Sequence, residues 1–465
     1  MVAGSIPAQG ATPLPTRVKA PADMTTSALS TDLYELNMVQ AYLDRGEDKT
    51  AVFEFFVRKL PARRSFLMAA GLDTALSYLE TLSFTPQEID WLRRSGRFRH
   101  NLLDYLESFR FTGDVHAMPE GTVFFPHEPI LRITAPLPQA QLVETRLISI
   151  MQFQSMIASK AARMVLAAGS KSLADFGLRS AHGAEAGLWA ARASYIAGFS
   201  GAANVAAGQV YGIPVVGTMA HSFVQVHGDE MAAFEQFARA RPDNVILLID
   251  TYDTTGGARK VVELAPKLKA DGISIRGVRI DSGDLVAGSK AVRAILDAGG
   301  LKEAVILVSG GINEDEILRL AKAGAPIDGY GIGANLTTSQ DAPTLDCAYK
   351  LQEYDGKPKR KLSEGKQTWP GRKQVWRNVA TDGVMTDDTV SLETDTPPGE
   401  ALIVPVMKDG KRIGTAPTLD ATRETARKNL AALPPKHREL DPDARYAVVI
   451  ADALQALARE TTSQN

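Results

Sequence analysis

The sequence predicts an α/β fold built on an irregular (β/α) barrel. Between residues 139 and 345, short apolar segments typical of buried strands alternate with stretches of helical periodicity. Successive strand ends lie roughly 22 to 40 residues apart, the length of a repeated strand–loop–helix unit. Six such units in a row favour a barrel over an open sheet. The expected strands are 173–176, 214–216, 245–249, 277–280, 304–308 and 327–330.

The segment 25–138 predicts a small α+β module in front of the barrel. Polar residues at 30–32 offer helix caps, and Thr85 with Glu88 forms a capping sequence for a later helix. A long helix over 141–168 then leads into the barrel domain, 139–345. The expected elements of the module are helices over 33–39, 73–82 and 85–93 and strands over 51–57, 122–125 and 130–133.

The two ends of the chain differ in composition. Residues 1–24 are rich in Ala, Pro, Gly and Thr and have no apolar core, so we expect a disordered tail and not a secretory signal. Residues 346–465 carry strand-like pieces at 375–376 and 401–404. We expect this last segment to return to the N-terminal module and to end in a helix.

The composition is that of an ordinary globular protein, with 45% apolar and 23% charged residues. A net charge of −2 argues against non-specific binding of nucleic acid. No apolar run approaches the ~18 residues that a membrane span needs. The single cysteine, Cys347, excludes an intramolecular disulfide and a multi-cysteine metal site. We therefore expect a cytoplasmic protein with neither a nucleic-acid nor a membrane partner.

Small, polar and charged residues follow all six expected strands. In a barrel the loops after the strands gather at one rim, and that rim holds the active site. Loops are polar in most proteins, so one such tail alone would mean little, but six together favour a common site. The tails are 177–182, 217–222, 250–254, 281–284, 309–311 and 331–335.

The tail Gly217-Thr218-Met219-Ala220-His221-Ser222 is the most informative of the six. It places His221 five residues beyond a strand end, among small and hydroxylated residues. A neutral imidazole is a competent nucleophile near pH 7. A histidine without a catalytic role is the alternative, and the neighbouring polar tails favour the catalytic one.

The last two tails suit a phosphate group. Ser309-Gly310-Gly311 leads into a helix start near 314, so backbone N–H groups and a helix N-terminus would face the same anion. Gly331 and Gly333 supply a second set of amides. Barrels commonly bind phosphate after their last two strands. The alternative is that these glycines only make tight turns.

Four carboxylates lie on the same expected rim, in Asp250-Thr-Tyr-Asp253 and Asp281-Ser-Gly-Asp284. They would hold Mg²⁺ on a polyphosphate or accept hydrogen bonds from sugar hydroxyls. The alternative for Asp250 is capping of the next helix.

Arg279 lies two residues before Asp281, so in a strand both side chains lie on one face. An inward cation suggests an anionic ligand, and Arg179 suggests the same. The alternative is an ion pair between Arg279 and an aspartate of a neighbouring strand.

Several of these motifs together resemble the nicotinate phosphoribosyltransferase family. They are Thr31-Asp32-Leu33-Tyr34, Phe176-Gly177-Leu178-Arg179, the tail around His221, Val278 to Asp284, Ser309-Gly310-Gly311, and residues 361–363 with 366–373. The match runs in order from about residue 31 to 377, and the region after 400 is less distinctive. The resemblance implies the irregular barrel of type II phosphoribosyltransferases.

The resemblance also implies an activity. The family joins nicotinate to phosphoribosyl pyrophosphate, giving nicotinate mononucleotide and pyrophosphate for NAD salvage. It couples this transfer to ATP hydrolysis through a phosphohistidine, which would be His221, and it uses Mg²⁺.

The resemblance assigns roles to individual residues. Tyr34 would stack on nicotinate, Thr218 would contact it, and Arg279 would pair with its carboxylate. Asp281 would face the ribose or Mg²⁺. The glycines that would cradle the 5-phosphate are Gly310, Gly311, Gly331 and Gly333. The rest of the expected substrate-binding set is Arg179, Ser222, Asp250, Asp284, Ser309 and Thr338.

The same resemblance points to one missing side-chain contact and to a homodimer. Many family members carry Thr where this chain has Ala334, so a hydroxyl contact there is absent or comes from Thr337 or Thr338. The basic run Arg58, Lys59, Arg63 and Arg64 would reach the site of a neighbouring subunit, which implies a homodimer with shared active sites.

Two other functions stay open on the sequence. Nicotinamide phosphoribosyltransferase shares the fold and the phosphohistidine, although Tyr34 and the motif set favour the acid as substrate. A non-catalytic barrel that binds a phosphosugar is the second alternative. An aldolase is disfavoured, because none of the six tails carries a lysine suited to a Schiff base.

Overall fold

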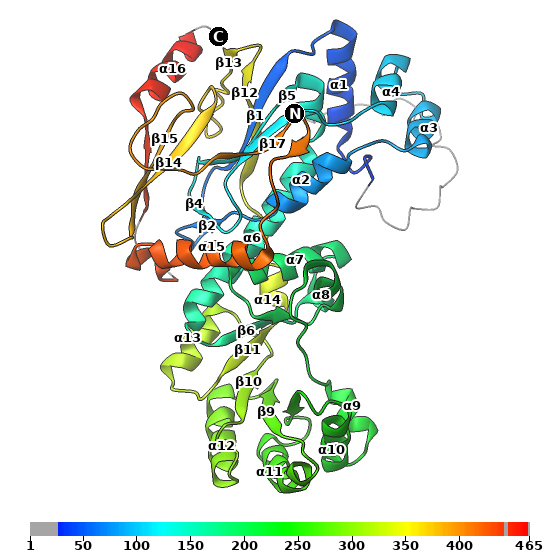
Figure 1. Cartoon of the computed structure of the whole chain (residues 1–465), viewed down its shortest axis with the longest axis vertical. Helices are drawn as coiled ribbons and strands as arrows, with labels where there is room; N and C mark the ends of the chain where they lie inside the picture. Colours follow the sequence, from blue (N-terminus) through cyan, green and yellow to red (C-terminus); the bar gives the residue numbers. More distant parts are fainter. Residues whose placement is uncertain (1–26, 441–444, 464–465) are drawn as a thin grey trace, which may run out of the picture.

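The computed structural model describes residues 27–440 and 445–463, so the expected tail 1–24 lies outside the described residues. Figure 1 shows two halves along the long axis of the molecule. Helices α1 (Leu33–Arg45) and α16 (Asp452–Ser463) lie in one half, with the antiparallel sheets, and the other half holds the parallel sheet. Helix α15 (Leu419–Ala432) lies across the boundary and packs against α7 (Ala184–Ala197).

The parallel sheet confirms the predicted fold class. Its six strands are hydrogen-bonded in the order β7-β6-β11-β10-β9-β8, and every pairing is parallel. Helices lie between the strands along the chain, as a strand–loop–helix repeat requires. The strands are β6 Ser172–Asp175, β7 Gly201–Ala202, β8 Val245–Leu248, β9 Ile275–Ile280, β10 Val305–Val308 and β11 Gly329–Ile332.

Two expected strands differ from the structure. The strand predicted at 214–216 is reduced to one isolated bridge, between Val215 and Ala202, and β7 was not predicted at all. The hydrogen-bonded sheet therefore ends at β7 and at β8, and the barrel is open between Val215 and β8. The strand predicted to end at Tyr330 continues to Ile332, so Gly331 lies inside β11 and the loop begins at Gly333.

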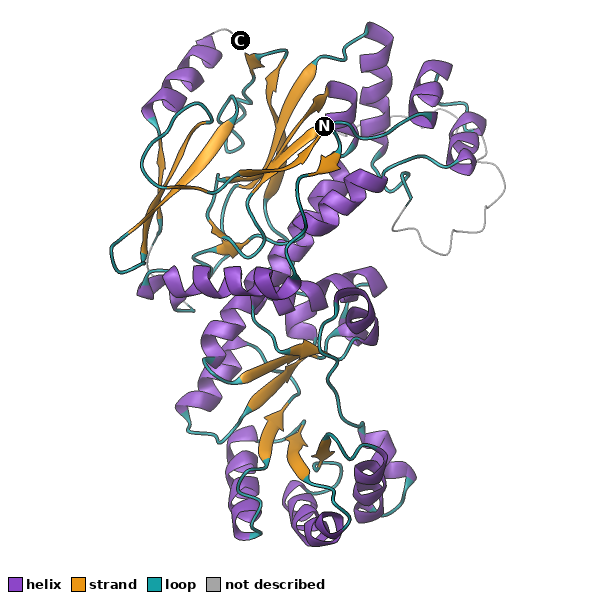
Figure 2. Cartoon of the chain, viewed as in Figure 1, coloured by secondary structure: helices purple, strands orange, loops and turns teal. Residues whose placement is uncertain are grey.

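Helices connect the strands of the parallel sheet (Figure 2). The helix predicted over 141–168 is split at Val143 into α5 and α6. The helices of this half and of the approach to it are α5 Leu137–Leu142, α6 Glu144–Ala168, α7, α8 Val205–Tyr211, α9 His221–Val226, α10 Glu230–Ala240, α11 Thr254–Ala270, α12 Leu285–Ala298, α13 Glu314–Lys322 and α14 Ala334–Thr337, with a 3₁₀ turn at Leu178–Ser180.

The other half joins segments from both ends of the chain. A seven-stranded sheet has the order β13-β12-β1-β5-β3-β17-β18, so β1 pairs with β12 from beyond residue 346, and β3 pairs with β17. The strands are β1 Thr50–Val57, β3 Asp114–Ala117, β5 Pro129–Pro136, β12 Cys347–Tyr354, β13 Lys357–Pro358, β17 Val404–Lys408 and β18 Lys411–Arg412.

A four-stranded sheet, β16-β14-β15-β19, consists entirely of C-terminal segments. Its strands are β14 Lys373–Val379, β15 Met385–Leu392, β16 Glu400–Ala401 and β19 Ala447–Ile450, and a two-stranded sheet pairs β2 Leu67–Met68 with β4 Val123–Phe124. The remaining helices are α1 Leu33–Arg45, α2 Leu72–Thr81, α3 Pro86–Arg94, α4 His100–Glu107, a 3₁₀ turn at Pro435–Arg438 and α16 Asp452–Ser463.

The predicted caps differ in outcome. Thr85 and Glu88 form the reciprocal capping box in front of α3. Asp32 occupies the N-cap position of α1, but its side chain makes no cap hydrogen bond and accepts one from Thr145 instead.

Candidate active site

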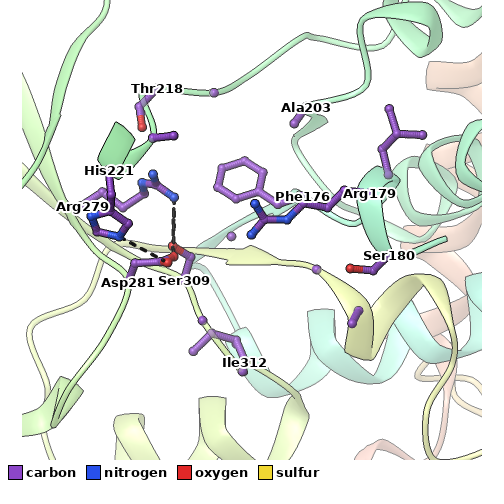
Figure 3. A pocket seen from close by; sticks show the side chains of 18 of the residues that line it. Phe176, Arg179, Ser180, Ala203, Thr218, His221, Arg279, Asp281, Ser309 and Ile312 are labelled. Carbon is purple, nitrogen blue, oxygen red and sulfur yellow. Dashed lines mark hydrogen bonds and ion pairs between the residues drawn. The ribbon is translucent and has the colours of Figure 1, made fainter. Parts of the chain in front are cut away.

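The loops after the parallel strands line one open cavity of about 850 Å³ (Figure 3). His221, Arg279 and Asp281 lie on one side of it, and Phe176 with Arg179 on the other. Five of the six predicted tails reach the cavity. Its lining is Phe176, Leu178, Arg179, Ser180, Ala203, Gly217, Thr218, Met219, Ala220, His221, Arg279, Asp281, Ser309, Gly310, Gly311, Ile312, Gly331, Gly333, Ala334 and Asn335.

Arg279 is the buried cation of this cavity. It lies near the end of β9, where its Nη1 donates to Ser309 Oγ at 3.2 Å and its Nη2 to the carbonyl of Met219 at 2.6 Å. Its side chain is only 13% exposed, and its Nε is buried without a partner. Desolvation lowers the pKa of the guanidinium from its ordinary value, although Asp281 opposes this shift. An anionic ligand would therefore relieve an under-compensated charge.

Asp281 links the cation to the histidine. Its Oδ1 accepts a hydrogen bond from Ser309 Oγ and lies 3.6 Å from Nη1 of Arg279. Its Oδ2 lies 3.8 Å from Nε2 of His221, whose Nδ1 is 3.1 Å from Thr251 Oγ1. His221 is the first residue of α9, and its side chain is 38% exposed. The imidazole thus lies between a hydroxyl and a carboxylate and stays partly exposed.

Asp250 and Asp284 were both predicted to bind substrate, but neither lines the cavity. Asp250 is not the cap of the next helix: its Oδ2 accepts from the backbone N–H of Asp281 and from Ser282 Oγ, and its Oδ1 is buried without a partner. Asp253 caps α11. Asp284 caps α12 through hydrogen bonds from two backbone N–H groups, and it does not line the cavity.

The loop after β10 needs glycine for two separate reasons. Gly310 and Gly311 have φ angles of +87° and +69°, a region that side chains disfavour. A Cβ on Gly310 would lie 2.1 Å from the carbonyl oxygen of Asp281, whereas one on Gly311 would meet no atom within 4 Å. Asn335 Nδ2 donates to the carbonyls of Gly311 and Ile312, at 3.0 and 2.9 Å. The two glycine-bearing loops are thereby joined.

Gly310→Ala should destabilise the protein by at least about 2 kcal/mol, because the left-handed φ and the clash with backbone add together. The matched variant Gly311→Ala has the strained φ alone, so about 1 kcal/mol is expected. Denaturant unfolding of both variants measures the difference. Equal losses would mean that the close approach to Asp281 does not restrict position 310.

Gly331 makes room for an aromatic wall. A Cβ there would lie 2.4 Å from the ring of Phe176, which lines the cavity. The guanidinium of Arg279 lies 5.9 Å from the centre of the same ring, within cation–π range. Gly331 therefore leaves the space that the ring of Phe176 occupies. It lies inside β11, whereas the sequence predicted it in the following loop.

Models of one protein family match nearly all of the described chain. The N-terminal domain of nicotinate phosphoribosyltransferase (NAPRTase) matches residues 29–152, the NAPRTase family 171–386, and the C-terminal domain 399–458. The chain belongs to the nicotinate phosphoribosyltransferase family.

Individual relatives in this family are similar over nearly their whole length. A nicotinate phosphoribosyltransferase of Mycobacterium tuberculosis is 49% identical over 429 residues, which are 92% of each chain. The human enzyme is 32% identical over 517 residues, 92% of this chain and 95% of the other.

Solved structures give the same relationship. Human nicotinic acid phosphoribosyltransferase has a TM-score of 0.83 at 30% identity, covering 92% of this chain and 99% of the other. A nicotinate-nucleotide pyrophosphorylase of Pyrococcus furiosus has a TM-score of 0.71 at 25% identity, covering 89% of this chain and 98% of the other.

The structure brings most of the site residues predicted for this family to the cavity, and five lie outside its lining. Tyr34 is on α1 in the other half of the molecule, where it is 43% exposed. The hydroxyl of Thr338 donates a hydrogen bond to the carbonyl of Ala334. Ala334 lines the cavity, whereas Thr338 does not. The predicted residues in the lining are Arg179, Thr218, His221, Arg279, Asp281, Ser309, Gly310, Gly311, Gly331 and Gly333; those outside it are Tyr34, Ser222, Asp250, Asp284 and Thr338.

Three of the four residues of the basic run near residue 60 form ion pairs within the chain. Arg58 pairs with Asp346 at 2.8 Å and Arg63 with Asp315 at 2.7 Å. The side chain of Arg64 is fully buried against Asp341. The expectation that Arg64 reaches a neighbouring subunit is therefore wrong, since burial inside its own subunit excludes that contact.

Beside Tyr34, the carboxyl of Glu35 is buried and accepts hydrogen bonds from the backbone N–H and the hydroxyl of Thr145, at 2.7 and 2.6 Å. Desolvation raises the pKa of Glu35 to about 7, against the opposing effect of these hydrogen bonds. In the unfolded chain the group ionises near its ordinary value of 4.5. Between pH 4.5 and about 7 the folded state therefore binds one proton more than the unfolded state. The free energy of unfolding falls as pH rises through this window.

Glu35→Gln should remove this pH dependence, because the amide stays neutral. The wild type should lose about 3 kcal/mol relative to the variant between pH 4.5 and 7. Thermal unfolding of both proteins from pH 4 to 8 measures the change. A constant difference across that range would mean that folding leaves the pKa of Glu35 unchanged.

Besides Arg279, three residues of the lining lie outside the six predicted tails. They are Phe176, directly after β6, Ala203, directly after β7, and Ile312, in the loop after β10. Phe176 stood within a family motif, but an aromatic residue at a strand end is usually core.

Within residues 27–440 and 445–463, no helix is both long and apolar enough to cross a membrane.

Proposed function

We propose that this protein transfers the phosphoribosyl group of phosphoribosyl pyrophosphate to nicotinate, coupled to ATP hydrolysis, in NAD salvage in the cytoplasm. The relatives that support the proposal are named nicotinate phosphoribosyltransferases and match 92% of this chain. The observation that carries it is the combination of one buried cation, Arg279, with a glycine loop at positive φ on the same cavity.

Two groups of residues in the cavity suit the two parts of the product, nicotinate and the phosphorylated ribose. Arg279 and the ring of Phe176 offer a charge and an aromatic face, which match the carboxylate and the ring of nicotinate. The loops at Gly310 and Gly333 offer backbone amides to the 5-phosphate. Asp281, which lies between these groups, would accept hydrogen bonds from the ribose hydroxyls.

The transfer needs no strong base. The ring nitrogen of nicotinate donates its lone pair to C1′ of the ribose, and the C1′–O bond breaks with its electron pair leaving on pyrophosphate. Positive charge develops on the sugar and negative charge on the leaving group, so the site must mainly compensate charge. Asp281 lies where it can stabilise the sugar, and Arg179 is a second cation of the lining for the anions.

The residues also fit a role for Mg²⁺ carried by pyrophosphate. Among the described residues no cluster of three or more His, Cys, Asp or Glu is built to hold a metal, so a dedicated protein cage is absent from that part of the chain. Mg²⁺ on phosphates typically needs only one or two carboxylates. Asp281, with Oδ2 directed toward the cavity side of His221, is the proposed ligand. Bound Mg²⁺ would neutralise charge on the leaving group.

The phosphohistidine is proposed at His221. Its imidazole is partly exposed at the cavity, beside Asp281, and would accept the γ-phosphoryl group of ATP while ADP leaves. Phosphorylation places close to two negative charges next to the pyrophosphate site. Hydrolysis of the phosphohistidine would then drive product release.

Tyr34 supports the proposal of a homodimer with shared active sites. It is exposed on α1, outside the cavity of its own subunit. If Tyr34 stacks on nicotinate, as the family resemblance implies, it must come from a neighbouring subunit. An active protein that sediments as a monomer would contradict the shared site.

The deciding experiment is incubation of the pure protein with nicotinate, phosphoribosyl pyrophosphate, Mg²⁺ and ATP. Nicotinate mononucleotide and pyrophosphate should form in equal amounts. Parallel reactions with nicotinamide, alone and in competition, test the other base. Binding of phosphoribosyl pyrophosphate without any pyrophosphate release would identify a non-catalytic phosphosugar-binding protein.

A further inference from the structure

We propose that a buried row of charges centred on Lys160 positions both glycine-bearing loops for phosphate binding. The row lies behind the cavity, and none of its members lines it. The inference rests on the proposed function, because it assigns those loops to the 5-phosphate. The members are Arg163, Glu314, Lys160, Asp341 and Arg64.

The first carboxylate of the row ends the loop after β10. Glu314 follows Asn313 directly and opens α13. Lys160 Nζ lies 2.6 Å from its Oε2, and Arg163 Nε 3.1 Å from its Oε1. All three side chains are at most 4% exposed. Because Lys160 and Arg163 lie three residues apart on α6, one helix face fixes the end of this loop.

The second carboxylate follows the loop after β11. Asp341 comes shortly after α14, which begins right behind Gly333. Its Oδ1 lies 2.8 Å from the same Lys160 Nζ and 3.2 Å from Arg64 Nη2. Arg64 also donates to Ser339 Oγ at 2.9 Å. Lys160 is therefore the one group of the row that contacts the carboxylates behind both loops.

The loops also contact each other in front of the row. Asn335 donates to the carbonyls of Gly311 and Ile312, so the two loops move together if either is displaced. Backbone amides stabilise a phosphate only when several point to one place, and errors near 1 Å can cost on the order of a hundredfold in rate. The row thus fixes the position of amides that it does not touch.

A purely structural role would not require charges here. Buried ion pairs are often no more stabilising than apolar residues of the same size, because desolvation offsets their attraction. What a charged row adds is a fixed register between α6 and two loops. The prediction is therefore a specific loss of phosphate recognition, beyond a loss of stability.

Lys160→Met tests this against Lys373→Met as the matched control. Lys373 is equally buried, and its Nζ lies 2.8 Å from Oε2 of Glu54 in the other half of the molecule. Both variants lose one buried lysine–glutamate pair, and Lys160→Met also loses the contact with Asp341, so both should unfold at lower temperature. Only Lys160→Met should raise the KM for phosphoribosyl pyrophosphate, by roughly 10- to 100-fold, with less than about a threefold change for nicotinate.

Binding of ribose 5-phosphate, measured by calorimetry, separates this inference from the proposed function. It requires no turnover, so weaker binding by Lys160→Met alone supports the row even if the wild type forms no mononucleotide. Asp341→Asn removes the negative charge that pairs with Lys160 and Arg64, at a partly exposed residue, and serves if Lys160→Met does not fold. Affinity and KM equal to wild type in a folded variant, or no binding by the wild type, would overturn the proposal.

Discussion

Arg279→Ala should raise the KM for nicotinate by about 30- to 1,000-fold, the equivalent of about 2–4 kcal/mol of lost charged hydrogen bonding. The KM for phosphoribosyl pyrophosphate should change far less. The physical reason is that Arg279 is a desolvated cation with an unpartnered Nε, so a bound carboxylate gains more from it than from an exposed arginine. Initial rates with each substrate varied in turn measure both constants.

Two further variants sharpen this test. Arg279→Lys keeps the charge and loses the planar fork, so it should recover only part of the nicotinate affinity. Arg179→Ala removes the other cation of the cavity, from the opposite side, and should act mainly on the phosphates. Equal effects of Arg279→Ala on both substrates would mean that its contact with Ser309 matters more than any contact with nicotinate.

His221→Ala should abolish the stimulation by ATP and leave a slower, uncoupled transfer. The imidazole is the proposed phosphoryl acceptor, whereas the groups that bind nicotinate and phosphoribosyl pyrophosphate stay in place. Transfer of labelled γ-phosphate to the protein should vanish, and the rate with ATP should fall to the rate without it.

His227→Ala is the control for this experiment. His227 follows α9 directly, but its Nδ1 lies 2.7 Å from the carbonyl of Phe223, and it does not line the cavity. It should label normally. Label that persists in His221→Ala would place the phosphoryl group on another residue.

The parallel strands could be predicted where local pattern and tertiary pairing agree. Residues 245–249 and 304–308 are short apolar runs between polar ones, and both became strands. Gly201–Ala202 has no such pattern, and it is a strand only because β6 and Val215 lie on its two sides. Conversely, 214–216 looks like a strand but has one partner only. Pairing decided these positions, and it cannot be read from one segment.

The sequence predicted which residue types form the site, but it did not predict the role of each carboxylate. Asp250 and Asp284 both precede helical segments, so sequence allowed either to cap. The structure gives the cap to Asp284 and directs Asp250 to the neighbouring loop. The buried row around Lys160 joins four segments that are far apart in the chain, so no spacing within any one of them indicates it.

The open edge of the parallel sheet bears on what the proposed phosphorylation of His221 would do to the cavity. Two backbone hydrogen bonds, from Ala202 to Pro214 and from Val216 to Ala202, fasten the stretch leading to His221 onto β7. Breaking both hydrogen bonds costs about 1–3 kcal/mol. New charged hydrogen bonds to one phosphoryl group can stabilise the displaced stretch by a similar amount. The proposed phosphorylation of His221 would therefore be able to displace this stretch, which lines the cavity.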